Sequence, residues 1–366
     1  MKSKLLVVVI ITLIFFLLLV SCSKNKETVS IIDSEDMPEQ ISQETEVEEQ
    51  PDSSNIDFRK IKPNEAGQVM VLMYHSIGEE EKEFTRTPEN FWKDLEILYE
   101  KGYRPISLKD YAEGNIDIEA GFSPVVITFD DGNQNQFNII SEEGGTYTID
   151  PQCAVGILID FHEKHPDFPL KATFFVNGGV PFGQKEYLDY KLNFLVDQGM
   201  DIGNHTASHF DFTNCTDSKS IENEIWTVKE KVEDIVRGYK VETLSLPYGS
   251  KPKKDESLFQ YIVEGKEHSY YNIAIVEVGW DPYKSPYTVD FNPFGIHRVR
   301  ASDLQEYVKG TGIYDWIDRL EKGERPKYIS DGDPDKVTIP EEYKEQIDLQ
   351  KIGDRDVVTY ILEDSE

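Results

Sequence analysis

Short apolar, β-branched runs alternate along this chain with segments whose apolar residues recur at helical spacing. The apolar runs lie at residues 69–74, 125–129, 172–176, 244–246 and 273–276. The helical stripes lie at residues 91–98, 188–196 and 221–235, and a glycine follows each stripe. Because buried strands that alternate with amphipathic helices need crossover connections, this pattern predicts an α/β fold with a parallel sheet. Folds of this kind place their chemistry at the carboxyl ends of the strands.

The first 21 residues have the pattern of a processing signal. Lys2 and Lys4 precede an apolar run at residues 5–20, which is shorter than the roughly 20 residues of a comfortable membrane span. The run ends in Leu-Val-Ser-Cys, which resembles a bacterial lipobox with Cys22 as the lipidated residue. A signal anchor and a plain signal peptide are the alternatives. A lipidated Cys22 would tether the chain to the cell membrane on the extracytoplasmic side.

The charge balance is strongly acidic. The 366 residues include 69 Asp and Glu against 38 Lys and Arg, a formal net charge of −31. Such a surface repels phosphate backbones, so we expect no nucleic-acid partner. Eleven of the acids, and no Lys or Arg, lie within residues 27–58. We therefore predict a disordered acidic linker over 22–66, one catalytic domain over 67–327, an unassigned extension over 328–366, and a monomer.

The first candidate for chemistry is a pair of adjacent carboxylates. Asp130 and Asp131 follow the apolar run at 125–129 and precede Gly132. Adjacent side chains of an extended strand point to opposite sides, so a turn is needed to bring both carboxylates to one cavity. Two such acids would differ in role and in pKa. An Asp-Gly turn with solvated acids is the alternative.

The second candidate is a pair of histidines. His205 and His209 lie four residues apart after the short run Asp201-Ile202. On a helical turn they would share one face, at a spacing that suits metal binding. One structural and one surface histidine is the alternative. Together with one carboxylate they would form an open three-ligand metal site, and a second carboxylate could act as general base.

These residues give the chain a specific resemblance from about residue 69 to residue 300. Thr128-Phe129-Asp130-Asp131-Gly132, the strand Ala-Thr-Phe-Phe-Val at 172–176, and His205 with His209 match in order. Leu246-Pro247-Tyr248-Gly249 matches in part. The chain thus resembles polysaccharide deacetylases of the NodB-homology type, carbohydrate esterase family four. The resemblance implies a distorted, partly open (β/α) barrel that removes acetyl groups from sugars with one divalent metal ion.

The resemblance also implies a role for each matched residue. Asp130 would be the general base, and Asp131, His205 and His209 would hold the metal ion. A metal-bound water would attack the acetamide carbonyl, and backbone donors near Tyr248 would stabilise the oxyanion. Zinc is the expected metal, and cobalt, nickel or manganese would also fit.

Two positions depart from the family pattern. Ser245 stands where the family has an arginine two residues before the proline, and Arg298 or Arg300 could supply that charge instead. The resemblance also implies a histidine that protonates the leaving amine. His297 is the one nearby candidate for this role, and a purely structural histidine is the alternative. Trp280-Asp281 resembles the family motif in which a tryptophan walls the pocket and an acid orients the histidine.

We therefore expect a membrane-anchored deacetylase that acts on an extracellular, N-acetylated glycan. An insertion at residues 133–171 is expected to border the substrate groove. Two other functions stay open: a glycan-binding protein that does not hydrolyse its ligand, and an O-acetyl esterase that uses the same site.

Overall fold

The computed structural model describes residues 57–141 and 146–361. The predicted signal segment, Cys22 and the acidic linker up to residue 56 lie outside these residues. Within them, no helix is both long and apolar enough to cross a membrane.

A parallel sheet forms the centre of the described chain. Its strands are β1 (Met70–Tyr74), β4 (Tyr103–Pro105), β5 (Ser123–Phe129), β8 (Thr173–Val176), β9 (Asp201–Asn204), β10 (Thr243–Ser245), β11 (Ala274–Val276) and β12 (Val299–Arg300). The strand order is β11-β10-β9-β8-β5-β1-β12, and β4 also pairs with β5. Every pair in this sheet is parallel.

A short segment closes the curled sheet on itself. Val299 and Arg300 pair with β1, while Ile296, three residues earlier, forms a parallel bridge to Val276 of β11. The backbone of Ile296 donates to Ile275 and accepts from Glu277. One stretch of chain therefore joins the two outer edges of the sheet, which gives the expected distorted, partly open (β/α) barrel.

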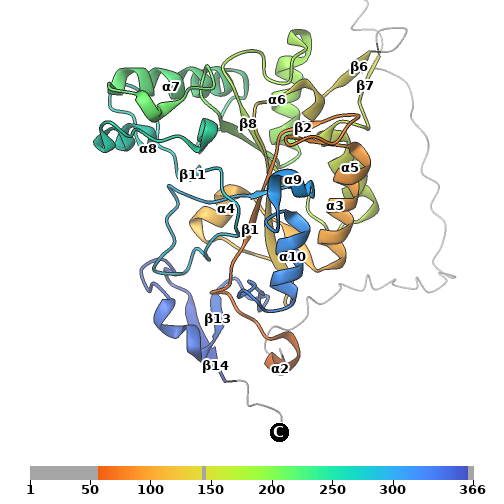
Figure 1. The fold of residues 1–366 in the computed structure, drawn as a ribbon, viewed down its shortest axis with the longest axis vertical. Coiled ribbons are helices and arrows are strands. Elements are labelled where there is room, and N and C mark those ends of the chain that lie inside the picture. Colours follow the sequence, from red (N-terminus) through yellow and green to blue (C-terminus); the bar gives the residue numbers. More distant parts are fainter. Residues whose placement is uncertain (1–56, 142–145, 362–366) are drawn as a thin grey trace, which may run out of the picture. The chain divides into compact units, whose positions relative to one another are not determined.

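Helices cover the outside of the sheet (Figure 1). They are α2 (Phe58–Ile61), α3 (Pro88–Glu100), α4 (Leu108–Glu113), α5 (Ala154–Lys164), α6 (Leu188–Asp197), α7 (Ser218–Ile235), α8 (Gln260–Val263), α9 (Gln305–Val308) and α10 (Ile313–Glu321). Figure 1 shows α3 beside α5, and α7 beside α8. The three helices and five strands predicted from apolar spacing are confirmed, with ends shifted by a few residues.

Short two-stranded sheets lie outside the central sheet. They are β2 (Ser76–Ile77) with β3 (Thr85–Arg86), β6 (Ile139–Ser141) with β7 (Tyr147–Ile149), and β13 (Lys336–Pro340) with β14 (Asp356–Tyr360). The β6–β7 pair is antiparallel and belongs to the insertion after β5. The other two pairs are parallel.

Side chains of each strand alternate between two apolar layers because successive residues face opposite sides. Leu72, Ile127 and Phe174 belong to the layer that packs under the helices α3, α5 and α6. Val71, Val126 and Phe175 belong to the opposite layer, which also contains Val337 and Ile339 of β13. The C-terminal extension, left unassigned from the sequence, thus shares a hydrophobic core with the barrel.

The extension packs at the amino ends of the strands. Tyr328 accepts a hydrogen bond from the Ser123 hydroxyl at the start of β5, and Gln68 bridges to Lys327 just before β1. Residues 64–66 are buried in the same region, so the structured chain begins before the predicted boundary at residue 67. Functional groups at the carboxyl ends therefore lie at the other end of the barrel.

The buried carboxyl group of Glu65 connects the start of the structured chain to the C-terminal extension. Its oxygens accept hydrogen bonds from the Tyr328 hydroxyl at 3.1 Å and the Thr338 amide at 2.8 Å. Burial, reinforced by the nearby Asp331 carboxylate, raises the pKa of Glu65 to about 8. The folded state therefore prefers Glu65 protonated at neutral pH.

We predict that Glu65→Gln stabilises the protein at pH 8 and flattens its pH dependence. The unfolded state releases the Glu65 proton near pH 4.5, whereas the folded state holds it until about pH 8. The wild type should therefore lose stability as pH rises through this window, by a few kcal/mol in all. Urea unfolding at pH 5 and pH 8 measures the change. Glu119→Gln, at an exposed position, should behave like wild type, and equal pH slopes for both variants would contradict the prediction.

Candidate metal and catalytic site

Polar side chains collect at the carboxyl ends of neighbouring strands. Asp130 and Asp131 follow β5, and His205 follows β9. Asn177 follows β8, and Tyr248 lies in a turn just after β10. Since the carboxyl ends of parallel strands meet at one edge, residues far apart in sequence are brought to a single site.

Asp131, His205 and His209 form a compact group of potential ligands. One ligand atom from each lies within 4.8 Å of the others. Asp131 Oδ1 is 3.5 Å from His205 Nε2 and 3.6 Å from His209 Nε2. Ligands of one tetrahedral zinc ion lie roughly 3.3 Å apart. The three residues therefore fit a divalent metal ion, and they leave a further coordination position open.

Hydrogen bonds to the protein orient this group. His205 Nδ1 lies 2.9 Å from the carbonyl of Ser245, so it carries the proton and Nε2 presents its lone pair. Asn177 donates to the carbonyls of His205 and Thr206, at 2.7 and 3.2 Å. Burial lowers the pKa of His209, which favours the neutral imidazole that a metal ion binds.

The histidine loop is not the helical turn that the spacing predicted. Residues after Asn204 leave β9 in an irregular loop, in which Thr206 and His209 have φ values of 61° and 56°. Asp131 and Tyr248 are likewise left-handed, at 78° and 60°. The turn at Asp131 is the one that the adjacent carboxylates required. Sequence spacing alone could not predict the loop, because helical geometry places i and i+4 together equally well.

Asp130 lies in a buried ion pair. Its Oδ1 accepts from Arg298 Nη1 at 2.7 Å and its Oδ2 from Arg298 Nη2 at 2.6 Å. The Ser245 hydroxyl donates to Asp130 at 3.2 Å and accepts from Arg298 at 3.0 Å. Arg298 therefore supplies the charge that Ser245 lacks, whereas Arg300 pairs with Glu83 at 2.6 Å.

This pair controls the ionisation of Asp130. Burial opposes ionisation, but the Arg298 guanidinium, assisted by His205, holds the pKa of Asp130 well below its usual range. His75 lies 3.9 Å from Asp130 Oδ2 and packs against the Phe84 ring. Burial lowers the pKa of His75. Asp130 is thus a permanent anion that is separate from the three candidate ligands.

His297 and Trp280 lie on the segments that close the barrel. His297 Nδ1 is 3.0 Å from Asp281 Oδ1, and its ring packs beside Tyr283. These contacts do not include Asp130 or the three candidate ligands. Trp280 is 65% exposed, and its carbonyl accepts from the Trp316 indole. Tyr248, 68% exposed, lies 4.5 Å from the His209 ring. Trp280 and Tyr248 are thus both largely exposed to solvent, and Tyr248 contacts a candidate ligand.

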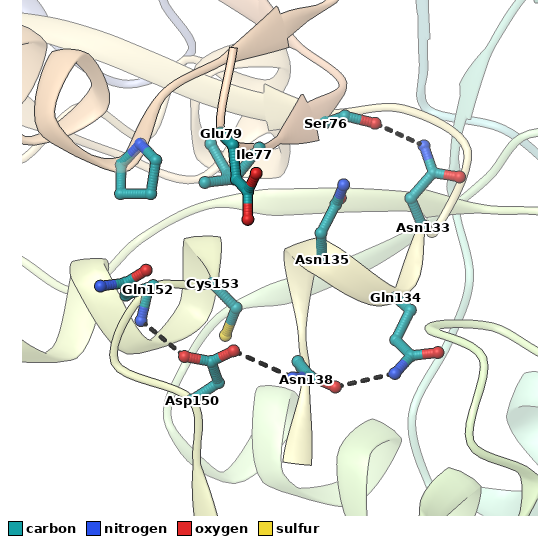
Figure 2. A pocket seen from close by; sticks show the side chains of 12 residues that line it. Ser76, Ile77, Glu79, Asn133, Gln134, Asn135, Asn138, Asp150, Gln152 and Cys153 are labelled. Atoms are coloured by element: carbon teal, nitrogen blue, oxygen red, sulfur yellow. Dashed lines mark hydrogen bonds between the residues drawn. The ribbon is translucent and has the colours of Figure 1, made fainter. Parts of the chain in front are cut away.

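Two cavities lie beside the candidate ligands. A cavity of about 330 Å³ is lined by Asp131, Asn177 and Val180, among others. A larger one of about 510 Å³ lies between the β1–α3 loop and the insertion after β5 (Figure 2). Asn133 and Gln134 line both. The sequence motifs did not point to Asn133 or Asn177, although both residues follow the end of an apolar strand run.

Comparison with known proteins agrees with this geometry. The family model for polysaccharide deacetylase matches residues 118–261, which include Asp130, Asp131, His205 and His209. The matched segment, 144 of the 366 residues, is similar to a polysaccharide deacetylase domain. It ends before the closing segment that carries Arg298.

Solved structures of deacetylases are similar to this chain. The Streptococcus pyogenes deacetylase PplD, solved in complex with acetate, is 17% identical over 67% of this chain and 98% of its own, with a TM-score of 0.49. A polysaccharide deacetylase from Bacillus cereus is 19% identical over 70% of this chain and 69% of its own, with a TM-score of 0.48. No curated protein sequence gives a significant match.

We predict that Arg298→Met destabilises the protein by about 3–5 kcal/mol, because it leaves the Asp130 carboxylate buried without its cationic partner. The double variant Asp130→Asn/Arg298→Met should regain most of this loss in urea unfolding at pH 7. Arg300→Met is the matched control, and its more exposed ion pair should cost less than about 1 kcal/mol. A double variant no more stable than Arg298→Met would show that lost packing, not charge, is responsible.

Proposed function

We propose that this protein is a metal-dependent deacetylase that hydrolyses N-acetyl groups of an extracellular or cell-wall polysaccharide. The observation that carries the proposal is the group of Asp131, His205 and His209, whose ligand atoms have the spacing of one metal ion. Zinc is the first choice for two imidazoles and one carboxylate, and cobalt, nickel or manganese would also fit. When bound, the ion would supply a Lewis acid that activates water and polarises the acetyl carbonyl.

Asp130 would accept a proton from the attacking water. Its ion pair with Arg298 keeps it ionised at neutral pH and fixes the direction of its lone pairs. A carboxylate with such a low pKa has little intrinsic driving force to take a proton. The proton transfer therefore requires a water whose own pKa has been lowered. A metal ion next to Asp130 would lower the pKa of such a water.

His297 would donate the proton that the leaving amine needs. Its hydrogen bond to Asp281 would fix the orientation of the ring and leave the other ring nitrogen free for the leaving amine. Trp280 would wall the substrate pocket on this side. The left-handed turn at Tyr248 would present backbone N–H groups to the oxyanion, since that turn packs against His209.

We also propose that Cys22 anchors the protein at the extracytoplasmic side of the cell membrane. Support comes from the basic residues, the apolar run and the lipobox-like end of residues 1–22. Cys22 lies outside the described residues. The glycan-binding and O-acetyl esterase alternatives keep the same site. The Arg298–Asp130 pair weakens the first, because Arg298 supplies the positive charge that is missing at Ser245.

We predict acetate release from short N-acetylglucosamine oligomers by the metal-loaded protein, and its loss after chelation. Asp131→Ala should lose bound metal and lower kcat/KM by more than the roughly 10–100-fold typical of an outer-shell partner. Metal content by mass spectrometry and an acetate assay measure the two effects. Acetate release that survives complete metal removal would contradict the metal role. No release from any of several acetylated glycans, with metal bound, would contradict the deacetylase function.

We predict that His297→Gln lowers kcat for an acetamide substrate by about 10²-fold, because an amine leaving group needs a proton. The same variant should hydrolyse 4-nitrophenyl acetate almost as well as wild type, since that leaving group departs as an anion. Asp281→Asn should also lose more kcat on the acetamide than on 4-nitrophenyl acetate, but by a smaller factor. His268→Gln, at a histidine whose ring stacks on Trp226, is the matched control. Equal losses on both substrates would assign His297 a structural role.

A further inference from the structure

The larger cavity beside the site is built from two segments that the proposed mechanism does not use. We call it the amide cavity. Its lining includes Ser76 and Glu79 from the β1–α3 loop, and Asn135, Asn138 and Gln152 from the insertion (Figure 2). With a volume of about 510 Å³ it has the size of a small-molecule site.

The amide cavity lies next to the smaller cavity at the candidate metal site. Asn133 and Gln134 stand between the two and line both of them. Asn133 Nδ2 lies 3.3 Å from Ser76 Oγ on one side and 3.4 Å from Asp131 Oδ2 on the other. A glycan with one ring at Asp131 therefore has room for a neighbouring ring in the amide cavity.

The lining chemistry combines neutral amides with carboxylates. Asp150 has its oxygens engaged by the Gln152 backbone amide and the Asn138 side chain, each at 2.9 Å. Glu79 points into the cavity, as does the Asn135 amide (Figure 2). No ion pair involves Glu79 within the described part of the chain, and the lining includes no lysine or arginine. The neighbouring Glu80, in contrast, pairs with Lys82 at 3.4 Å.

We infer that the amide cavity binds an amino-sugar ring that carries a free, protonated amine. The amine would pair with Glu79 and donate to amide oxygens, while the ring hydroxyls would bond the other amides. This inference rests on the proposed function, because such a ring is what deacetylation of a neighbouring unit produces. A ring with a free amine in the amide cavity thus favours reaction at the next acetylated ring, and deacetylation proceeds in blocks.

Calorimetric titration of the metal-loaded protein tests the inference. The probes are tetramers of glucosamine and of N-acetylglucosamine with the same linkage, each in β-1,4 and β-1,6 form, at pH 6, where an aliphatic amine is protonated. Wild type should bind a glucosamine tetramer at least about tenfold more tightly than its acetylated counterpart, the effect expected for one hydrogen bond to a charged group. Glu79→Gln should lose this preference, and Glu80→Gln should keep it.

Acetate release from the acetylated tetramer, measured on the same samples, separates this inference from the proposed function. A Glu79-dependent preference in a protein that releases no acetate would uphold the amide cavity and sink the deacetylase proposal. Acetate release without any glucosamine preference in wild type would overturn the amide-cavity inference alone. A preference that Glu79→Gln leaves intact would also overturn it, because the amine would then bind elsewhere.

Discussion

The ion pair between Arg298 and Asp130 is the interaction on which the rest of the site depends. Asp130 lies at the end of β5, in the middle of the sheet, and Arg298 lies on the segment that joins the two sheet edges. Each of them is almost fully buried, so either charge alone would be costly in the interior. The pair therefore fixes the closing segment against the sheet, and it fixes one carboxylate beside the three candidate metal ligands.

Much of the fold could be predicted from the sequence because its signals are local. Buried strands such as β5 contain continuous apolar runs. Helix α7 has apolar residues at helical spacing, and a glycine follows its end. The barrel closure could not be read in this way. It depends on Ile296 and β12, which are too short to give a pattern, and on the pairing of β12 with β1, more than 200 residues earlier. The C-terminal strands β13 and β14 gave no sequence signal, and their place in the fold comes from tertiary contacts: Val337 and Ile339 pack into the barrel's apolar layer, and the Thr338 amide donates to Glu65.

The residues of the candidate site were likewise predictable only where their signal is local in sequence. Asp130, Asp131, His205 and His209 stand next to strand ends, where sequence order already indicates convergence. The sequence left Arg298 and Arg300 as the two candidates to replace the family arginine. They lie two residues apart, so strand alternation puts them on the same face, and only the three-dimensional structure shows that Arg298 is the one that pairs with Asp130. The local shape of the histidine loop was predicted wrongly, because left-handed residues such as Thr206 and His209 leave no composition signal. Such conformations cost energy and persist where the surroundings enforce them, which is common at functional sites.

The closing segment has a consequence for how the protein becomes active. Asp130 and Arg298 are 168 residues apart along the chain, and the three candidate ligands all precede residue 210. A chain that has folded only through β11 already holds the three candidate metal ligands, but Asp130 has no partner and His297 is missing. Under the proposed function, the segments up to β9 would supply all the metal ligands, whereas the general base and the proton donor would be in place only after the long-range contact of the closing segment has formed.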